Sequence, residues 1–158
     1  MIDLRATIVL IALCRTAAAD HGAETVEVDG EALASPLDPW IGGSLHYEHR
    51  FADSKYGLTL RGGVATGEDV LDDGKSFTKV SGIIGLREHW GLVYFEASAG
   101  WTGIRRTRFA DGEAQRGTHW DHGPDFEVEV GRRIGPVNLG VFAALLGLGV
   151  RVGFAIGD

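Results

Sequence analysis

The stretch IGGSLHYEHRF, residues 41–51, decides the fold, and YGLTLRGGV, residues 56–64, repeats its pattern. In both stretches apolar residues fall on every second position, with His49 as an exception, and glycine, hydroxyl or charged residues stand between them. Successive side chains of a β-strand point to opposite faces. The alternation therefore predicts two strands, each with one apolar and one polar face, joined by a tight turn at residues 52–55.

The same alternation recurs along the chain. It is clear in four further segments, residues 79–87, 94–101, 126–131 and 150–157. A weaker strand is expected at residues 24–32 (ETVEVDGEA), and a strand before residue 150 completes a final hairpin. No helical period competes in these segments. The sequence thus predicts an all-β chain with eight antiparallel strands.

Residues 137–157 permit a second interpretation. The run is almost continuously apolar up to Val150, and Gly149, Gly153 and Gly157 have the spacing of a transmembrane helix dimer. Arg151 interrupts the run too early for a helical span of roughly 20 residues. A hairpin is therefore preferred to a helix.

The connections between the expected strands alternate in length. Short ones are expected at residues 52–55, 88–91 and 133–136, and long ones at residues 66–77 and 105–123. Transmembrane barrels have this rhythm, with tight periplasmic turns and longer extracellular loops. An even number of strands places both termini on the periplasmic side.

Residues 1–19 have the layout of a secretory signal peptide. Arg5 precedes a short apolar core at residues 6–13, and Ala17, Ala18 and Ala19 supply small residues at the cleavage position. The alternative is a buried N-terminal helix or strand. Cleavage leaves residues 20–158 as one β-barrel domain.

The mature chain would be acidic and free of thiols. Removing Arg5, Arg15 and Asp3 from 15 basic and 22 acidic residues leaves 13 and 21, a net charge of −8. This argues against a nucleic-acid partner, which requires basic surface. Cys14, the only cysteine, leaves with the signal peptide, so disulfides and thiolate metal sites are excluded.

The polar face combines small residues with charges of both signs, which suits the narrow interior of an eight-stranded barrel. Aromatic residues near the strand ends fit interfacial girdles, with Trp40, Trp101 and Phe126 at the upper edge. We therefore expect the apolar face to meet lipid and the charges to form a network in the lumen. The predicted network consists of Glu48, Arg50, Arg61, Arg87, Glu96, Glu127, Glu129 and Arg151.

The strand rhythm, the signal peptide and the C-terminal segment make the chain resemble small eight-stranded outer-membrane barrels of the OmpA and OmpX type. Gly149, Val152 and Phe154 fit the spacing of the C-terminal assembly signal of such barrels, although four residues follow the aromatic. The resemblance covers residues 24–158. It implies an up-and-down transmembrane β-barrel in the outer membrane of a Gram-negative-type cell envelope.

Two groups of residues are candidate ligand sites. Two histidines and two aspartates in the segment GTHWDHGPD have side chains that suit zinc or copper, against the alternative of a solvated polar loop. These residues are His119, Asp121, His122 and Asp125. Arg105, Arg106 and Arg108 follow Trp101, where they would meet lipopolysaccharide phosphates, since guanidinium groups suit phosphate.

The sequence carries no enzyme signature and implies no cofactor. Ser76 with His119 or His122 is the only nucleophile and base that the expected topology brings near each other, and no local motif supports it. The predicted function is a structural or surface-interaction role for an outer-membrane barrel with a filled lumen. The alternatives are a soluble barrel that binds a small apolar ligand and, less favoured, a lipid-modifying enzyme.

Overall fold

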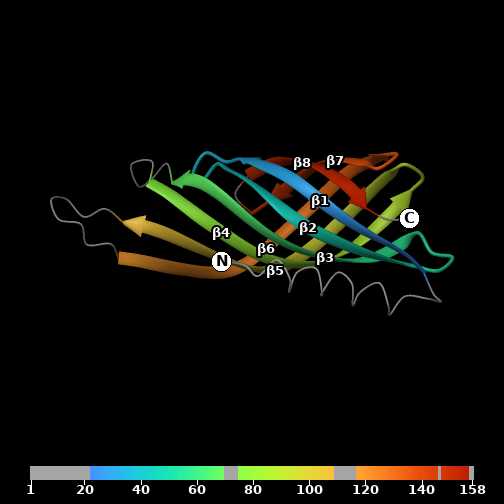
Figure 1. The fold of residues 1–158 in the computed structure, drawn as a ribbon, viewed down its shortest axis with the longest axis horizontal. Helices are drawn as coiled ribbons and strands as arrows, with labels where there is room; N and C mark the ends of the chain where they lie inside the picture. Colours follow the sequence, from blue (N-terminus) through green and yellow to red (C-terminus); the bar gives the residue numbers. More distant parts are fainter. Residues whose placement is uncertain (1–21, 70–74, 109–116, 146, 157–158) are drawn as a thin grey trace.

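The computed structural model describes residues 22–69, 75–108, 117–145 and 147–156, which form a closed barrel of eight antiparallel strands (Figure 1). Each strand pairs with its neighbours in the sequence, and β1 closes the barrel against β8. The predicted all-β, up-and-down architecture is therefore confirmed. The strands are β1 (Gly22–Ala34), β2 (Trp40–Phe51), β3 (Tyr56–Asp69), β4 (Lys75–Trp90), β5 (Val93–Arg108), β6 (Gly117–Ile134), β7 (Val137–Ala144) and β8 (Gly147–Ile156).

The two ends of the barrel differ. One end, here called the terminal end, holds the start of β1, the end of β8 and the turns at residues 52–55, 91–92 and 135–136. The opposite end, the loop end, is where β3, β4, β5 and β6 extend furthest, toward the left of Figure 1. The predicted signal peptide at residues 1–19 lies outside the described residues.

Local backbone chemistry explains the tight turns at the terminal end. Gly91 and Gly135 each occupy the first of two turn residues, with φ angles of 64° and 59°. Two-residue hairpins favour a glycine there because a positive φ matches the twist of the flanking strands. The turn after β2 uses Asp53 instead, at φ 55°, and aspartate tolerates this region better than most residues.

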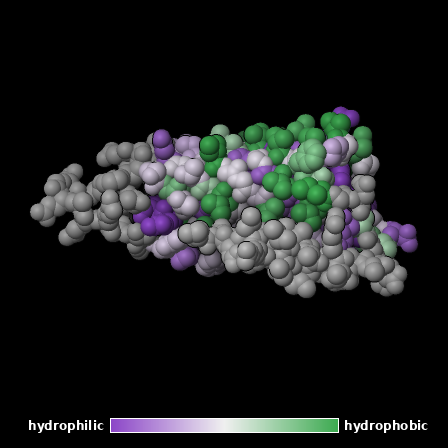
Figure 2. Space-filling view, in the orientation of Figure 1, coloured by the Kyte–Doolittle hydropathy of each residue, from purple (hydrophilic) through white to green (hydrophobic). Residues whose placement is uncertain are grey.

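The strand register places the apolar positions on the outside of the barrel. Tyr47 pairs with Leu60, and Leu60 pairs with Ile84, so these outward side chains lie at one height on three neighbouring strands. Leu60 is 58% exposed and Ile84 is 53% exposed. Figure 2 shows hydrophobic side chains gathered over the centre and right of the visible face, with hydrophilic ones toward the loop end.

The strands at the loop end are longer than the sequence indicated. Residues 66–77 and 105–123 were expected to be loops, but β3 continues to Asp69, β4 starts at Lys75, β5 continues to Arg108 and β6 starts at Gly117. Strand pairing depends on the backbone alone. Except for Trp120, the described outward side chains here are polar, among them Thr66, Glu68 and Arg105, so the strands continue where the alternation has ended.

The C-terminal segment is a hairpin, and the alternative of a transmembrane helix is wrong. β7 and β8 pair from Val137 with Phe154 to Ala144 with Gly147. Within this hairpin Val141 and Val150 face outward as a pair, while Phe142 turns inward against Gly149. Among the described residues, no helix has the length and apolar character to span a membrane.

An apolar cluster fills the interior toward the loop end. It consists of Leu33, Trp40, Ala65, Phe77 and Phe142. The expectation that Trp40 belongs to an outer girdle is wrong, because the side chain is buried and its ring lies 6.0 Å from that of Phe142. Trp40 starts β2 on the inward parity of Ser44 and His46, one position before the outward Ile41.

Candidate functional site

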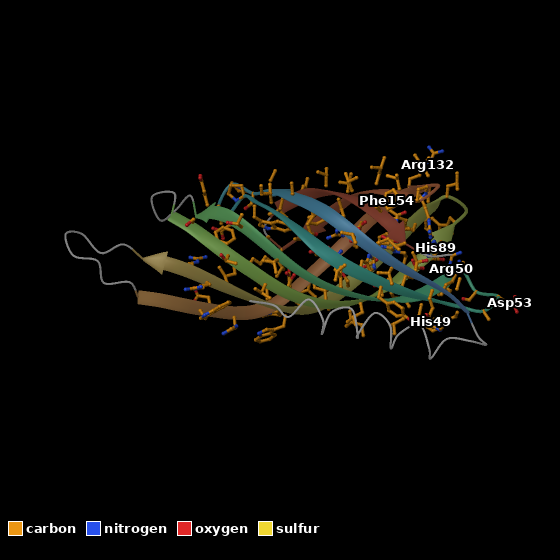
Figure 3. All side chains as sticks on the ribbon, viewed as in Figure 1. His49, Arg50, Asp53, His89, Arg132 and Phe154 are labelled. Atoms are coloured by element: carbon orange, nitrogen blue, oxygen red, sulfur yellow. The ribbon has the colours of Figure 1, made fainter. Side chains whose placement is uncertain are left out.

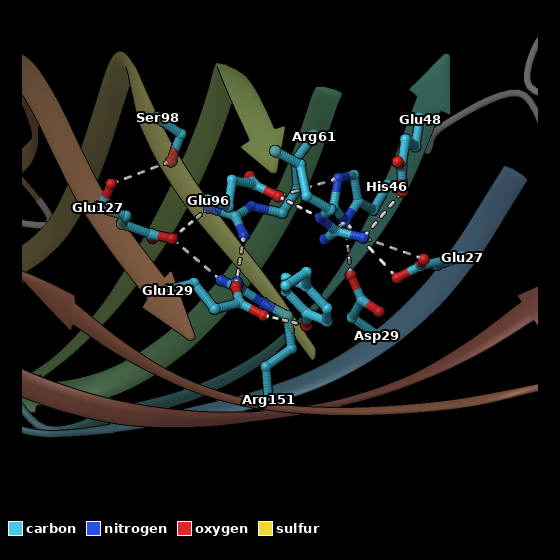
Figure 4. A network of polar contacts seen from close by, with 12 residues as sticks. Glu27, Asp29, His46, Glu48, Arg61, Glu96, Ser98, Glu127, Glu129 and Arg151 are labelled. Carbon is cyan, nitrogen blue, oxygen red and sulfur yellow. Dashed lines mark hydrogen bonds and ion pairs between the residues drawn. The ribbon is translucent and has the colours of Figure 1, made fainter. Parts of the chain in front are cut away.

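Arg87 is the centre of a buried polar network in the terminal half of the barrel. Figure 4 shows this network, with the acids Glu27, Glu48 and Glu96 labelled. Its Nε donates to Glu96 Oε2 at 2.9 Å across the β4–β5 pair. Its other nitrogens donate to Glu27 at 3.3 Å, to Glu48 at 3.1 Å and to His46 Nδ1 at 3.2 Å. Because the side chain is 2% exposed, these contacts replace the water that a guanidinium otherwise requires.

Arg151 and Arg61 form the second half of the network. Arg151 donates to Glu31 at 2.7 and 3.0 Å, to Glu127 at 3.1 Å, and also to Glu129. Arg61 donates to Glu127 and lies 3.7 Å from Glu129. Thus β3 and β8 share the same two carboxylates of β6, which ties three strands together across the lumen.

Aromatic rings and glycines shape the space around these ions. The guanidinium of Arg87 lies 4.1 Å from the centre of the Tyr94 ring, and the Tyr94 hydroxyl donates to Glu129 at 2.5 Å. Tyr94 pairs with Gly131, where a Cβ would overlap with the tyrosine ring. A glycine opposite the ring is therefore what allows an interior this narrow to hold a tyrosine beside an arginine.

The network ends at the terminal end with Glu48. His89 lies 2.5 Å from Glu48, and Arg50 lies 3.9 Å from it (Figure 3 labels His89 and Arg50). Arg50 is 38% exposed, so it stands at the rim of the barrel. Seven of the eight residues predicted for the lumen are thus buried there, and Arg50 is the exception.

Sequence reasoning missed three members of the network on β1, namely Glu27, Asp29 and Glu31. All three side chains are buried inside the barrel. The signal was present, because Thr25, Glu27, Asp29 and Glu31 alternate with Val26 and Val28. The pattern predicts the strand at residues 24–32, but the predicted lumen network omits its acidic face.

The four residues predicted to bind a metal are not all brought together. Asp125 is buried and accepts from Thr102 at 2.7 Å, with the Lys79 ammonium 2.8 Å away. His122 is exposed and stacks on Trp120. Asp121 lies 3.8 Å from Arg106. The His119 side chain lies outside the described set, and alternation along β6 separates His122 from Asp125.

Of the three arginines predicted to meet lipid phosphate, one faces outward and one has inward parity. Arg105 is exposed and shares the outward parity of Trp101. Arg106 has the opposite parity and lies 3.8 Å from both Asp38 and Asp121. The side chain of Arg108 lies outside the described set.

Two pockets open at opposite ends of the barrel. One, of about 280 Å³, lies at the loop end among Trp40, Lys79 and Asp125. The other, of about 550 Å³, lies at the terminal end against Glu48 and Arg50. Along β2 and β6 the buried network residues lie between them, so ion pairs separate the two pockets.

An apolar exterior around buried ion pairs, in a closed barrel of eight strands, defines the architecture of small outer-membrane β-barrels. No family model and no curated protein matches the chain. Among solved structures, the N-terminal β-barrel domain of Pseudomonas aeruginosa OprF matches 85% of this chain and 99% of its own, with 16% identity and a TM-score of 0.59. The attachment invasion locus protein Ail of Yersinia pestis, solved with the heparin analogue sucrose octasulfate, matches 87% of this chain and 95% of its own, with 12% identity and a TM-score of 0.55.

Proposed function

We propose that this protein is an integral outer-membrane barrel with a filled lumen and a structural or surface-interaction role, not an enzyme. The observation that supports it is the inverted polarity of the barrel. Arg61, Arg87 and Arg151 are buried, while Leu60 and Val130 on the outside are more than half exposed. In water this arrangement would expose apolar surface and bury charge, whereas in a bilayer it is favourable.

A soluble barrel that binds an apolar ligand is the alternative. Such a barrel places its apolar face inside. Here the interior apolar cluster is confined to the loop end, beside the pocket of about 280 Å³. The ion pairs occupy the remaining interior. The apolar side chains face outward, and they have no covering unless lipid supplies it.

Cell fractionation tests the proposal and the predicted export signal in one preparation. We expect the protein in the outer-membrane fraction, resistant to urea extraction, with an N-terminus at or near Asp20. Intact-mass measurement of the membrane-bound protein checks the second point. Recovery in the soluble periplasmic fraction would contradict membrane insertion, and an intact Met1 in the membrane-bound form would contradict cleavage.

The filled lumen predicts that the barrel does not conduct ions. Arg87 joins β4 to β1 and β2, and Arg61 joins β3 to β6, so a hydrated ion would have to break several buried ion pairs to pass. Planar-bilayer recordings of the pure protein should therefore show no steady conductance, measured beside a known porin as the positive control. Steady conductance from the wild-type protein would exclude a filled lumen.

The proposed partner at the loop end is lipid, and in particular lipopolysaccharide phosphate. Arg105 supports this because it is exposed on the same outward face as Trp101, which is itself 58% exposed. A guanidinium just beyond an interfacial tryptophan stands at the height of lipid headgroups.

Ser76, the candidate nucleophile, lies on β4 opposite Glu68 of β3, with β5 between it and His122. An acyl-transfer role therefore has no supporting geometry in the described residues.

A further inference from the structure

The interior holds more negative charge than its cations balance. Among the described residues, eight carboxylates line the lumen, namely Glu27, Asp29, Glu31, Glu48, Glu96, Asp125, Glu127 and Glu129. Four permanent cations face them inside the barrel, namely Arg61, Arg87, Arg151 and Lys79. Arg50 adds a fifth at the rim. Buried ions are stable only when they are compensated, so the excess calls for protons or for an added cation.

Asp29 is the carboxylate with the weakest compensation. Its side chain is 0% exposed, yet neither an arginine nor a lysine of the described residues lies within 4.0 Å of it. Its Oδ2 accepts only a 3.4 Å hydrogen bond from Ser44, and its Oδ1 has no hydrogen-bond partner among the described atoms.

Glu27 and His46 complete a cluster around this carboxylate. His46 Nδ1 lies 3.7 Å from Glu27 Oε2 and 3.8 Å from Asp29 Oδ2, and the three candidate ligand atoms lie within 4.8 Å of one another. Figure 4 shows the Glu27 and Asp29 side chains reaching from β1 toward His46 on β2. All three residues are buried.

The geometry points to a divalent metal site of the zinc class formed by Glu27 Oε2, Asp29 Oδ2 and His46 Nδ1. Imidazole nitrogen and carboxylate oxygen bind zinc at about 2.0–2.2 Å. Two ligands at that distance and a tetrahedral angle lie about 3.4 Å apart. The two separations from His46, of 3.7 and 3.8 Å, therefore need to close by only a few tenths of an ångström, and the two carboxylate oxygens lie within 4.8 Å of each other.

The contact with Arg87 favours the histidine tautomer that such a site requires. Arg87 donates to Nδ1, so this nitrogen carries a lone pair, and Nε2 lies 3.7 Å from Glu96 Oε2. The ring proton of the neutral imidazole is then on Nε2, which has no hydrogen-bond partner among the described atoms, and the lone pair of Nδ1 is the one that can bind a metal. The ion would replace the hydrogen bond from Arg87 to His46, and Arg87 would retain its bonds to Glu27, Glu48 and Glu96.

Because the site is buried, the test uses tag-free protein that is unfolded in urea and refolded into lipid vesicles, one sample with zinc present and one with a chelator, and both are then desalted. We expect about one zinc ion per chain by elemental analysis, because the described residues contain one such cluster. Zinc should raise the midpoint temperature of unfolding relative to the chelated sample, since a ligand bound only to the folded state stabilises it. Cobalt substitution should give the visible bands of a low-coordinate site.

Asp29→Asn should abolish zinc retention, and in chelator it should be at least as stable as the wild type, because it removes a buried carboxylate that lacks a cation. The matched control is His122→Gln, which removes an exposed imidazole and should retain the ion. If Asp29→Asn fails to fold, His46→Gln provides the same test. Two results would overturn the site. One is wild-type protein that contains no zinc, and the other is zinc that is lost in His122→Gln and retained in Asp29→Asn. These outcomes do not depend on the membrane role, which fractionation tests.

Discussion

Replacing Arg87 by methionine is expected to lower the free energy of unfolding by about 3–5 kcal/mol, because the change leaves buried carboxylates without their cation. Arg87 is bound to Glu27, Glu48 and Glu96, and these three acids have few other cations within reach. Methionine retains most of the volume and removes the charge. Reversible urea unfolding in lipid vesicles, followed by tryptophan fluorescence, measures the difference.

Arg50→Met is the matched control, since the same substitution at the rim removes one ion pair at 3.9 Å from a partly exposed arginine. Its cost should stay below about 1 kcal/mol. Glu96→Gln should also cost less than Arg87→Met, because carboxylates are in excess and Arg87 would retain Glu27 and Glu48. Equal losses for Arg87→Met and Arg50→Met would mean that the interior is hydrated and the network carries little of the stability.

The sequence predicted the barrel well where one face is apolar throughout. In β2 and β3 the turn at residues 52–55 and the alternation on both sides determine the register, in which His46 pairs with Arg61. Prediction failed where an apolar side chain faces the lumen instead of the outside of the barrel. Trp40 and Phe142 are apolar side chains that point inward, and no periodicity distinguishes an inward aromatic from an outward one at a strand end.

The charged interior could be predicted in part as a set of residues, without the acids of β1, but not as a set of contacts. Arg87 with Glu96 follows from the pairing of β4 with β5. Arg61 with Glu127 joins β3 to β6, and Arg87 with Glu27 joins β4 to β1. Such pairs cross the lumen through long side chains, so they depend on the diameter of the closed barrel, which pairing of neighbouring strands alone does not reveal.

Replacing Leu60 by arginine is expected to cost about 2–4 kcal/mol in folding into a bilayer, if the outward face of β3 meets hydrocarbon at mid-depth. Ile84 pairs with Leu60 at the same height, and Val128 is an outward residue of β6, so Ile84→Arg and Val128→Arg should behave alike. Reversible unfolding in vesicles measures each variant. Ser98→Ala, on the inward parity, should cost much less, because it removes one weak hydrogen bond of 3.4 Å.

The cost of arginine at two depths along one strand shows whether the outside of the barrel meets lipid or water. Tyr56 faces outward at the terminal end of β3, four residues before Leu60, and it is 38% exposed. Arginine near a membrane interface costs only about 0–1 kcal/mol, because its side chain reaches the headgroups. Tyr56→Arg should therefore be tolerated where Leu60→Arg is not. In water both positions would be solvated, so arginine would cost about the same at each. Equal tolerance at both positions would therefore contradict the membrane face and favour a soluble barrel.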